Sequence, residues 1–359
     1  MKVLHLIQKN QLRGAEVFTC QLAKLQQREG HDVKVVALFA GEADLPFKTK
    51  SLGRPSNRRF VDYFGWKQLA EIIEEFQPDI VQANAGDTLK YAVFSRKLFR
   101  WKVPIIARNA STVSLYIKST HQRWLNNILY RAVDYVISVS EASKKDLNKI
   151  FSATQAKSCT IPIGVDISKK ASVVEGFEKD HFNIVHVGGF SFEKNHKMLV
   201  EAFAELHRQY SSIRLHLIGD GILKNNILQM AIELGLQKVV SFHGYRNNAV
   251  DYIHSADLLV LPSVIEGLPG VILEAQYYKT PVLATDVGGV SEIIAHGTTG
   301  WMIEPDIQQL VGGILKVLEM DAASKENVVK NAHEQVIQHY NNEVIAKKFL
   351  QVYRQVLKR

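Results

Sequence analysis

Two carboxylates stand at the ends of a short glycine-containing stretch, with seven residues between them. Glu266 precedes the stretch, and Glu274 lies one turn into a helical pattern that begins near Gly270. A helix that begins after such a turn offers free N–H donors and the positive end of its dipole, which suits a phosphate group. Gly270 has no Cβ, so a ligand can approach the backbone there. Because helical side chains lean toward the N-terminus, both carboxylates are expected to face one ligand.

A cation and two glycine turns stand elsewhere in the same half of the chain. Gly188 and Gly189 follow an apolar run, and Lys194 precedes the next helical pattern. Gly244 and Tyr245 follow another apolar run. Each of these features also has an ordinary explanation, because carboxylates are mildly favourable at any helix start and a lone lysine before a helix is usually solvated.

Composition describes a globular chain with room for two domains. It has 359 residues, of which 46% are hydrophobic and 22% charged. Its two cysteines, Cys20 and Cys159, give no disulfide framework and no metal-binding pattern, which favours a reducing cytoplasm. No apolar run approaches the length that spans a bilayer, and we interpret the first apolar residues as a buried strand rather than a signal peptide.

Charge is distributed unevenly along the chain. Residues 1–170 carry a net charge of +12, and residues 171–359 carry −4. This asymmetry indicates an anionic partner for the first half. One concentration of charge is the predicted loop with Lys48, Lys50, Arg54, Arg58 and Arg59. Without an accompanying nucleic-acid-binding motif, an anionic membrane surface is the better hypothesis.

A second basic segment runs from Lys118 to Arg131. Its residues Trp124, Leu125 and Ile128 have helical spacing and form an apolar stripe. Such a stripe is typical of a helix that faces the core, and it is also compatible with a helix that docks on a membrane.

The elements that must position these residues alternate between strand and helix patterns. In the first half the predicted strands are residues 3–7, 33–37, 80–82, 103–107 and 133–139, and the predicted helices lie near residues 15–29, 66–77, 86–99, 119–132 and 141–150. In the second half the predicted strands are residues 184–187, 215–218, 239–242, 256–261, 281–284 and 301–303. This order predicts parallel sheets covered on both faces, with ligands at the carboxyl ends of the strands.

The spacing of the two glutamates, in the setting Ser-Val-Ile-Glu-Gly-Leu-Pro at 263–269, resembles the E-x7-E motif of the retaining glycosyltransferases of family 4. The Glu193-Lys194 loop, the His243-Gly244-Tyr245 turn and the turn at 286–292 occur in that family's order. The resemblance covers nearly all of the second half and is weaker in the first. It implies the GT-B fold, with two Rossmann-like, doubly wound α/β domains that face a cleft.

The resemblance also assigns roles to residues. Glu266 and Lys194 would be catalytic, with Glu266 acting as a nucleophile or as an orienting group. The donor, a nucleotide-sugar, would be bound by Gly14, Gly189, Lys194, Gly244, Tyr245, Glu266, Gly267, Leu268, Pro269, Gly270, Val271 and Glu274. The acceptor side would comprise Arg13, Asn84, Arg108 and Asn109. No metal site and no cofactor are expected.

This chain departs from the family pattern at several of these positions. Arg13 stands where the family has the first of two glycines, and Gly189 stands where it has an arginine. Asn84 and Asn109 stand near places where the family often has histidines. Unlike an imidazole, an amide cannot take up or release a proton near neutral pH. Lys194 is therefore expected to be the principal mobile cation for the leaving group.

The predicted domains follow from the resemblance and from composition. An N-terminal acceptor-side domain would span 1–167 and include a terminal helix, 342–359, that crosses back to it. A polar hinge linker would span 168–180, and a nucleotide-sugar-binding domain would span 181–341.

The predicted function is that of a metal-independent retaining glycosyltransferase. It would move a sugar, from a UDP-sugar by family precedent, to a glycan or lipid-linked acceptor in the synthesis of cell-surface polysaccharide or glycolipid. The expected location is the cytoplasm, with possible attachment to the inner face of the membrane. The alternatives are a GT-B sugar-nucleotide epimerase or hydrolase, and a non-catalytic sugar-nucleotide-binding partner.

Overall fold

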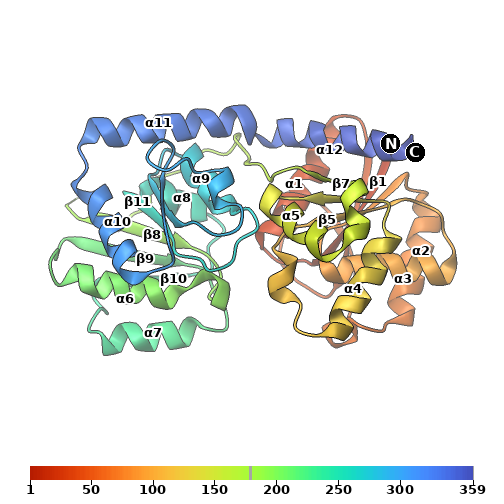
Figure 1. Ribbon diagram of the computed structural model, residues 1–359, viewed down its shortest axis with the longest axis horizontal. Coiled ribbons are helices and arrows are strands. Elements are labelled where there is room, and N and C mark those ends of the chain that lie inside the picture. The colour runs from red at the N-terminus through yellow and green to blue at the C-terminus, as the bar shows by residue number, and fades with distance from the viewer. Residues whose placement is uncertain (178–179, 359) are drawn as a thin grey trace. The chain divides into compact units, whose positions relative to one another are not determined.

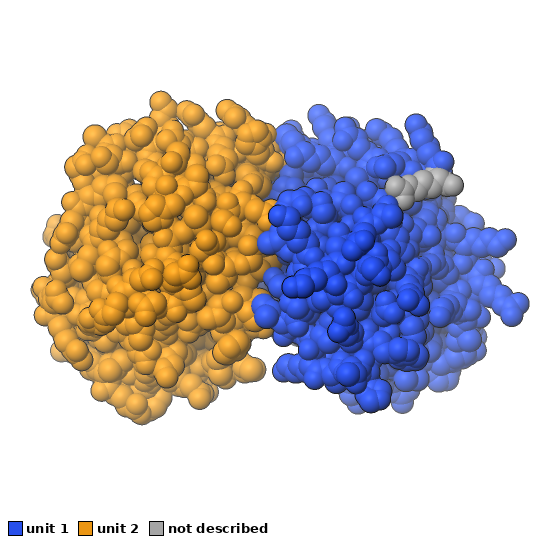
Figure 2. Space-filling view, viewed as in Figure 1, with its two compact units in different colours: residues 1–166, 342–359 blue, residues 167–341 orange. Residues whose placement is uncertain are grey.

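The computed structural model describes residues 1–177 and 180–358. The chain divides into two compact units, shown in different colours in Figure 2. Unit 1 comprises residues 1–166 and 342–359, and unit 2 comprises residues 167–341. Each unit contains one parallel sheet with helices packed on it (Figure 1). Among the described residues, no helix combines the length and the apolar character needed to cross a membrane.

Unit 1 is built on a seven-stranded sheet. Its strands are β1 (Lys2–Lys9), β2 (Asp32–Phe39), β3 (Thr49–Arg54), β4 (Ile80–Ala83), β5 (Ile105–Asn109), β6 (Tyr135–Ser138) and β7 (Ser158–Thr160). Their order across the sheet is β3-β2-β1-β4-β5-β6-β7, and neighbouring strands pair in parallel. The helices are α1 (Gly14–Arg28), α2 (Tyr63–Phe76), α3 (Gly86–Phe99), α4 (Thr120–Ala132), α5 (Glu141–Ile150) and α12 (Asn342–Leu357).

The first strand shows why this sheet is covered on both faces. Successive side chains of a strand point to opposite faces. Leu4 and Leu6 accordingly enter a core shared with α2 and α3, whereas Val3 and Ile7 enter a second core shared with α1 and α12. A continuous apolar run in the sequence thus becomes a strand buried from two sides.

The C-terminal helix α12 belongs to unit 1 although it is the last element of the chain. Phe349 packs against Phe18 of α1, with ring centroids 6.1 Å apart. The Tyr353 hydroxyl donates to the Gln82 side chain on β4 and accepts from the Gln26 amide. This helix therefore completes one of the two cores of unit 1.

Unit 2 is built on a six-stranded parallel sheet. Its strands are β8 (Phe182–Val187), β9 (Ile213–Ile218), β10 (Val240–Gly244), β11 (Leu258–Leu261), β12 (Val282–Thr285) and β13 (Trp301–Ile303). Their order is β10-β9-β8-β11-β12-β13. The helices are α6 (His196–His207), α7 (Lys224–Glu233), α8 (Ala249–Ser255), α9 (Gly270–Tyr277), α10 (Ile307–Glu319) and α11 (Ala322–His339).

The strand and helix predictions are confirmed in position, with shifts of a few residues at their ends. The predicted basic loop at 48–59 was wrong in part, because residues 49–54 form the edge strand β3. This strand escaped prediction because its sequence, TKSLGR, contains a single apolar side chain, Leu52, which packs into the core. The short strand β7 also went unpredicted.

The stretch 168–180 was predicted to be a hinge linker. Residues 178 and 179 lie outside the described residues, whereas the part before them is bonded to unit 2. The Ser172 N–H donates to Asp251 at 2.9 Å, and the Phe177 ring stacks on His216 with centroids 4.0 Å apart. The contact boundary between the units falls between Asp166 and Ile167.

Candidate functional site

The order of strands in unit 2 places the predicted donor-binding residues at one point of the sheet. From β8 the chain proceeds to β9 and β10 on one side, while β11, β12 and β13 lie on the other. The strand order therefore reverses between β8 and β11, and crevices at such reversals are the usual ligand sites of doubly wound sheets. The loop after β8 carries Lys194, and the loop after β11 carries Glu266.

These two loops are joined by backbone and side-chain contacts. The Val264 N–H donates to the Glu193 carbonyl at 2.8 Å. The Lys194 ammonium contacts Glu266 Oε1 at 2.5 Å, and the Ser263 hydroxyl donates to the same oxygen at 2.7 Å. Residues 72 positions apart in sequence thus form one ion pair at the ends of adjacent strands.

The backbone of Glu266 is fixed from the side of β12. The Thr285 hydroxyl, at the end of β12, bonds the Ser263 carbonyl. Gly288 adopts a φ of +60°, and a Cβ at that position would lie well inside contact distance of the Glu266 carbonyl oxygen. The turn at 286–292 therefore needs glycine at 288 for two reasons, its left-handed backbone and the closeness of the Glu266 loop.

The helix α9 begins at Gly270 with no side-chain cap. Its N-cap residue is Pro269, which makes no side-chain hydrogen bond to the helix. The first N–H groups of a helix have no intrahelical acceptor. The backbone around Gly270 and Val271 therefore provides donors to an anionic group, as the sequence predicted for a phosphate site.

The second carboxylate, Glu274, differs from Glu266 in its surroundings. The residue is partly exposed, yet burial of its carboxyl raises its pKa to about 7, and the positive charge of Lys169 offsets this only in part. No hydrogen bond reaches its carboxyl from any described residue. A carboxyl with a perturbed pKa and no internal partner is characteristic of a binding position.

The predicted base-contacting turn lies at the end of β10. Gly244 has a φ of +68°, and its carbonyl accepts from the Gly219 N–H at 2.9 Å. The Tyr245 side chain that follows is 48% exposed. The turn thus presents an aromatic ring to solvent at the same edge of the sheet as the other loops.

Two buried histidines beneath the loop after β8 were missed by the sequence reasoning. His186 donates from Nδ1 to the Val260 carbonyl at 2.8 Å, while its Nε2 and both ring nitrogens of His196 lack partners among the described residues. Burial lowers the pKa of His186 to about 4 and that of His196 to about 2. Both rings are therefore neutral, and the positive charge of this loop comes from Lys194. A histidine inside an apolar strand run was the available signal.

The predicted acceptor-side amides in unit 1 are used within that unit. Asn84 is 3% exposed, and its amide donates to the Leu6 carbonyl at 3.1 Å and accepts from Gln82 at 2.8 Å. Asn109 is likewise buried and donates to the Ser143 carbonyl at 3.2 Å. These contacts hold the ends of β4 and β5.

The two predicted acceptor-side arginines have opposite environments. Arg13 is exposed and precedes α1, next to the exposed Gly14. Arg108 is buried with its guanidinium 4.5 Å from the Phe18 ring centroid, and its Nε and Nη1 lack hydrogen-bond partners within the described chain. Burial lowers the Arg108 pKa to about 10 and raises that of nearby Glu16, whose charge supports the guanidinium.

Comparison with known proteins identifies both halves of the chain. Residues 12–169 match the model of Glycosyltransferase Family 4, and residues 168–335 match that of Glycosyl transferases group 1. Each half of the chain therefore matches a family of glycosyltransferase domains. The matches adjoin one another and leave only short stretches at the ends of the chain outside them.

Two relatives show how far the similarity extends. An uncharacterized glycosyltransferase of Methanocaldococcus jannaschii is 29% identical over 235 residues, which are 61% of this chain and 59% of the relative. The N-acetylgalactosamine-N,N'-diacetylbacillosaminyl-diphospho-undecaprenol 4-alpha-N-acetylgalactosaminyltransferase of Campylobacter jejuni is 26% identical over 244 residues, 66% of each chain. The chain thus aligns with about three fifths to two thirds of the length of these relatives.

A solved structure shares the fold over the whole chain. The crystal structure of Anabaena Alr3699/HepE in complex with UDP and glucose superposes with a TM-score of 0.84 at 21% identity, covering 99% of this chain and 100% of that one. This likeness and the two parallel sheets confirm the α/β architecture of the GT-B class. The glycosyltransferase family prediction is confirmed at the level of the domain families.

Proposed function

We propose that this glycosyltransferase moves a sugar from a nucleotide-sugar to a hydroxyl acceptor with retention at the anomeric carbon. The observation that supports this most is the cluster at the reversal of strand order in unit 2. There the Lys194–Glu266 ion pair, the uncapped start of α9 and the unpartnered Glu274 carboxyl all lie on loops at one edge of the sheet.

The donor is assigned to these groups by their chemistry. Lys194 carries three N–H donors, of which one is directed to Glu266, so its ammonium can also bind a diphosphate oxygen. The N–H groups at Gly270 and Val271 supply further donors to the same diphosphate. Glu274 accepts hydrogen bonds from the ribose hydroxyls, and Tyr245 packs on the base. Gly267, Leu268 and Pro269 shape the loop, while Gly14 and Gly189 leave room for close approach.

The reaction is a substitution at the anomeric carbon. The bond from that carbon to the β-phosphate oxygen breaks, a bond to the acceptor oxygen forms on the same face, and the acceptor proton passes to the departing phosphate. Glu266 faces the donor sugar and stabilises the positive charge that develops at the carbon. Lys194 and the α9 dipole offset the charge on the leaving diphosphate, and in this proposal they do so without a metal ion.

The identity of the donor and acceptor is suggested by the relatives. Anabaena Alr3699/HepE was crystallised with UDP and glucose, and the name of the Campylobacter relative includes diphospho-undecaprenol. We propose a UDP-sugar as donor and a glycan or lipid-linked acceptor, in cell-surface polysaccharide or glycolipid synthesis on the cytoplasmic side. On the acceptor side we assign direct contact to the exposed Arg13. Asn84 and Asn109 support the acceptor side by holding the ends of β4 and β5, and Arg108 packs on Phe18 with two nitrogens left without partners among the described residues.

The test begins with thermal shifts in UDP, GDP and ADP, followed by turnover of the corresponding sugar conjugates with and without acceptor. We expect UDP to raise the melting temperature and product to require an added acceptor. NMR of the product must show the anomeric configuration of the donor. Turnover without acceptor would instead indicate an epimerase or hydrolase. Tight nucleotide binding without turnover across an acceptor panel would indicate a non-catalytic partner.

A further inference from the structure

Unit 1 exposes an unusual run of large apolar side chains between β3 and the first turn of α2. Phe60 is 64% exposed, Val61 73%, Tyr63 50% and Phe64 61%. These are four of the five residues at 60–64, and we call them the aromatic ridge. Contiguous exposed apolar surface of this kind marks an interaction site more often than isolated exposed side chains do.

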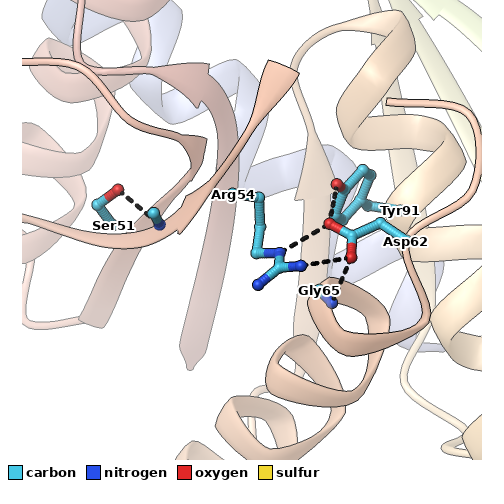
Figure 3. Close-up of polar contacts among 6 residues, drawn as sticks. Ser51, Arg54, Asp62, Gly65 and Tyr91 are labelled. Atoms are coloured by element: carbon cyan, nitrogen blue, oxygen red, sulfur yellow. Dashed lines mark hydrogen bonds and ion pairs between the residues drawn. The ribbon is translucent and has the colours of Figure 1, made fainter. Parts of the chain in front are cut away.

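The remaining residue of the run, Asp62, holds the ridge in place (Figure 3). Its carboxylate is 2% exposed and accepts two hydrogen bonds from Arg54, each of 2.8 Å. It also accepts from the Tyr91 hydroxyl at 2.7 Å and from the Gly65 N–H at 3.1 Å, which caps α2. Since Asp62 is anchored inward, its neighbours on both sides remain directed outward.

A glycine is needed beside this anchor. A Cβ on Gly65 would lie 2.6 Å from Asp62 Oδ2 and 2.8 Å from the Tyr91 ring. The sequence thus combines a buried charge, its bidentate arginine and a tightly packed glycine to fix a segment that buries little apolar surface of its own. These contacts therefore hold the segment in a conformation in which the side chains of the ridge are exposed to solvent.

The ridge continues onto the end of α3. The Tyr63 ring packs beside Phe99, with centroids 5.8 Å apart, and Leu98 next to it is 49% exposed. The Lys90 ammonium lies 4.5 Å from the Phe60 ring centroid. The apolar surface therefore spans two helices and has a cation at its margin.

Most charges in the segment that carries the ridge are positive, although on the adjoining helices Glu71 pairs with Lys67 and Asp87 pairs with Lys90. Between residues 48 and 67 the basic side chains are Lys48, Lys50, Arg54, Arg58, Arg59 and Lys67. The one acidic side chain in that stretch, Asp62, is buried and paired with Arg54. At the end of α3, Lys97 and Arg100 are also exposed. A partner of this surface must be apolar in its interior and negatively charged at its boundary.

We propose that the aromatic ridge docks unit 1 on the surface of an anionic lipid bilayer. Aromatic side chains insert favourably at the boundary between headgroups and acyl chains, and each flanking Lys or Arg adds attraction to anionic lipids. A protein surface would have to match both the apolar ridge and its basic margin, whereas an anionic bilayer presents both kinds of chemistry. Docking does not require the proposed function, although it would bring the acceptor-side unit to a membrane that holds a lipid-linked acceptor.

The test is flotation of the full chain with vesicles of phosphatidylcholine alone or mixed with phosphatidylglycerol. We expect the wild-type chain to float with the anionic vesicles and to be released by salt. The double variant Phe60→Ser/Phe64→Ser should lose binding by about tenfold or more, the scale for two partly inserted aromatic rings. Arg58→Ser/Arg59→Ser should weaken binding and flatten its salt dependence.

Matched controls separate the ridge from general loss of apolar or basic surface. Leu228→Ser/Ile232→Ser removes two exposed apolar side chains from α7, and Lys347→Ser/Lys348→Ser removes two exposed charges from α12. Both controls should float as the wild type does. Melting temperature and nucleotide affinity verify that every variant is folded.

Three outcomes would overturn the proposal. The first is a wild-type chain that stays in the vesicle-free fraction, and the second is a ridge variant that floats as well as the α7 control. The third is a ridge substitution whose only effect is to convert a dimer to a monomer in sedimentation. The last result would identify a second copy as the partner. Sugar transfer to a water-soluble acceptor is measured in parallel with the wild-type chain. If this chain floats with anionic vesicles but transfers no sugar, the result contradicts the proposed function and leaves the docking proposal standing.

Discussion

The two units share one architecture and use their strand ends in opposite ways. In unit 2 the loops after β8 and β11 bring an ion pair, an uncapped helix start and an unpartnered carboxyl to the reversal of strand order. In unit 1 the strand-end side chains Asn84 and Asn109 are buried and bonded to their own unit. The same fold therefore leaves polar groups available to a ligand in unit 2 and closes these two amides in unit 1, where the buried Arg108 still has nitrogens without hydrogen-bond partners among the described residues.

The contrast between the two units indicates where a ligand can bind. Polar groups that are already satisfied by the fold contribute to stability, and polar groups that the fold leaves unsatisfied are available to a ligand. We therefore expect substitutions at the strand ends of unit 2 to affect turnover and nucleotide affinity. Those in unit 1 should affect stability.

The largest expected effect is that of Glu266→Ala. Turnover should fall by roughly 10²-fold or more, the scale for removing a group that stabilises charge in the transition state. The measurement is donor turnover at saturating acceptor, with Glu233→Ala, an exposed carboxylate on α7, as the control. Turnover near the wild-type rate would remove Glu266 from the mechanism and with it the main contrast between the units.

The next effect tests whether the Glu266 loop is positioned by its neighbour. Gly288→Ala places a Cβ against the Glu266 carbonyl at a left-handed backbone position, so we expect a loss of about 2–4 kcal/mol in stability and reduced turnover. Gly235→Ala is the matched control, since Gly235 has a φ of +72° and no atom within 4 Å of the added Cβ. Both variants strain a left-handed backbone, but only Gly288→Ala also crowds the Glu266 carbonyl. Denaturant titration measures the loss of stability of each, and equal losses would show that crowding has no effect.

Lys194→Ala should weaken binding of the negatively charged donor diphosphate. Losing a charge-assisted hydrogen bond to the diphosphate corresponds to about 1.5–3 kcal/mol, or roughly 10- to 100-fold in nucleoside diphosphate affinity. Calorimetry measures this directly. Lys197→Ala removes a nearby exposed lysine on α6 and should leave affinity unchanged. Equal affinities of the two variants would argue against the diphosphate role.

The counterpart in unit 1 is Asn84→Ala. It removes the bonds to Leu6 and Gln82 and leaves buried partners unsatisfied, so stability should fall by about 1–3 kcal/mol. The acceptor KM of the folded fraction should stay within about twofold of the wild-type value. A raised acceptor KM with an unchanged melting temperature would contradict the contrast and restore Asn84 as a direct acceptor contact.

The smallest effect concerns the pH dependence of Glu274. Because its pKa is raised to about 7, its carboxylate forms only as pH rises through neutrality, and affinity for an intact nucleotide-sugar should increase by up to about tenfold from pH 6 to pH 8. Glu274→Gln should abolish this dependence. A nucleotide-sugar is the suitable ligand, since its phosphates are diesters and stay ionised throughout this range.

The same carboxyl makes a stability prediction with a definite sign. The folded state keeps the proton up to pH about 7, whereas the unfolded chain releases it near its ordinary value of 4.5. The unfolded state therefore binds fewer protons in this window, and wild-type stability falls as pH rises from 4.5 to 7. Glu274→Gln should be more stable than the wild type at pH 8 by ~1–3 kcal/mol, with the gain vanishing below pH 5. Thermal melts at the two pH values check this.

The order of strands and helices could be predicted from the sequence, because apolar periodicity and glycine turns are local properties of the chain. It also identified Glu266 and Glu274 as candidates, since a glutamate pair around a helix start is visible in one stretch, whereas the role of Lys194 was predicted from the family resemblance. The same local reasoning treated residues 48–59 as a loop, because the edge strand β3 buries only Leu52. It likewise placed Asn84 and Asn109 on the acceptor side without indicating the hydrogen bonds that both make within unit 1.

Which of these side chains have hydrogen-bond partners depends on how distant segments of the chain pack together. Lys194 reaches Glu266 because β8 and β11 are neighbours in the sheet, a pairing of segments 72 residues apart that no local pattern encodes. His186 and His196 became visible as buried neutral rings, and Asp62 as the buried anchor of an exposed ridge, for the same reason. Burial and hydrogen-bond partners are set by elements that meet from distant parts of the chain, and they decide whether a polar group stabilises the fold or serves a ligand.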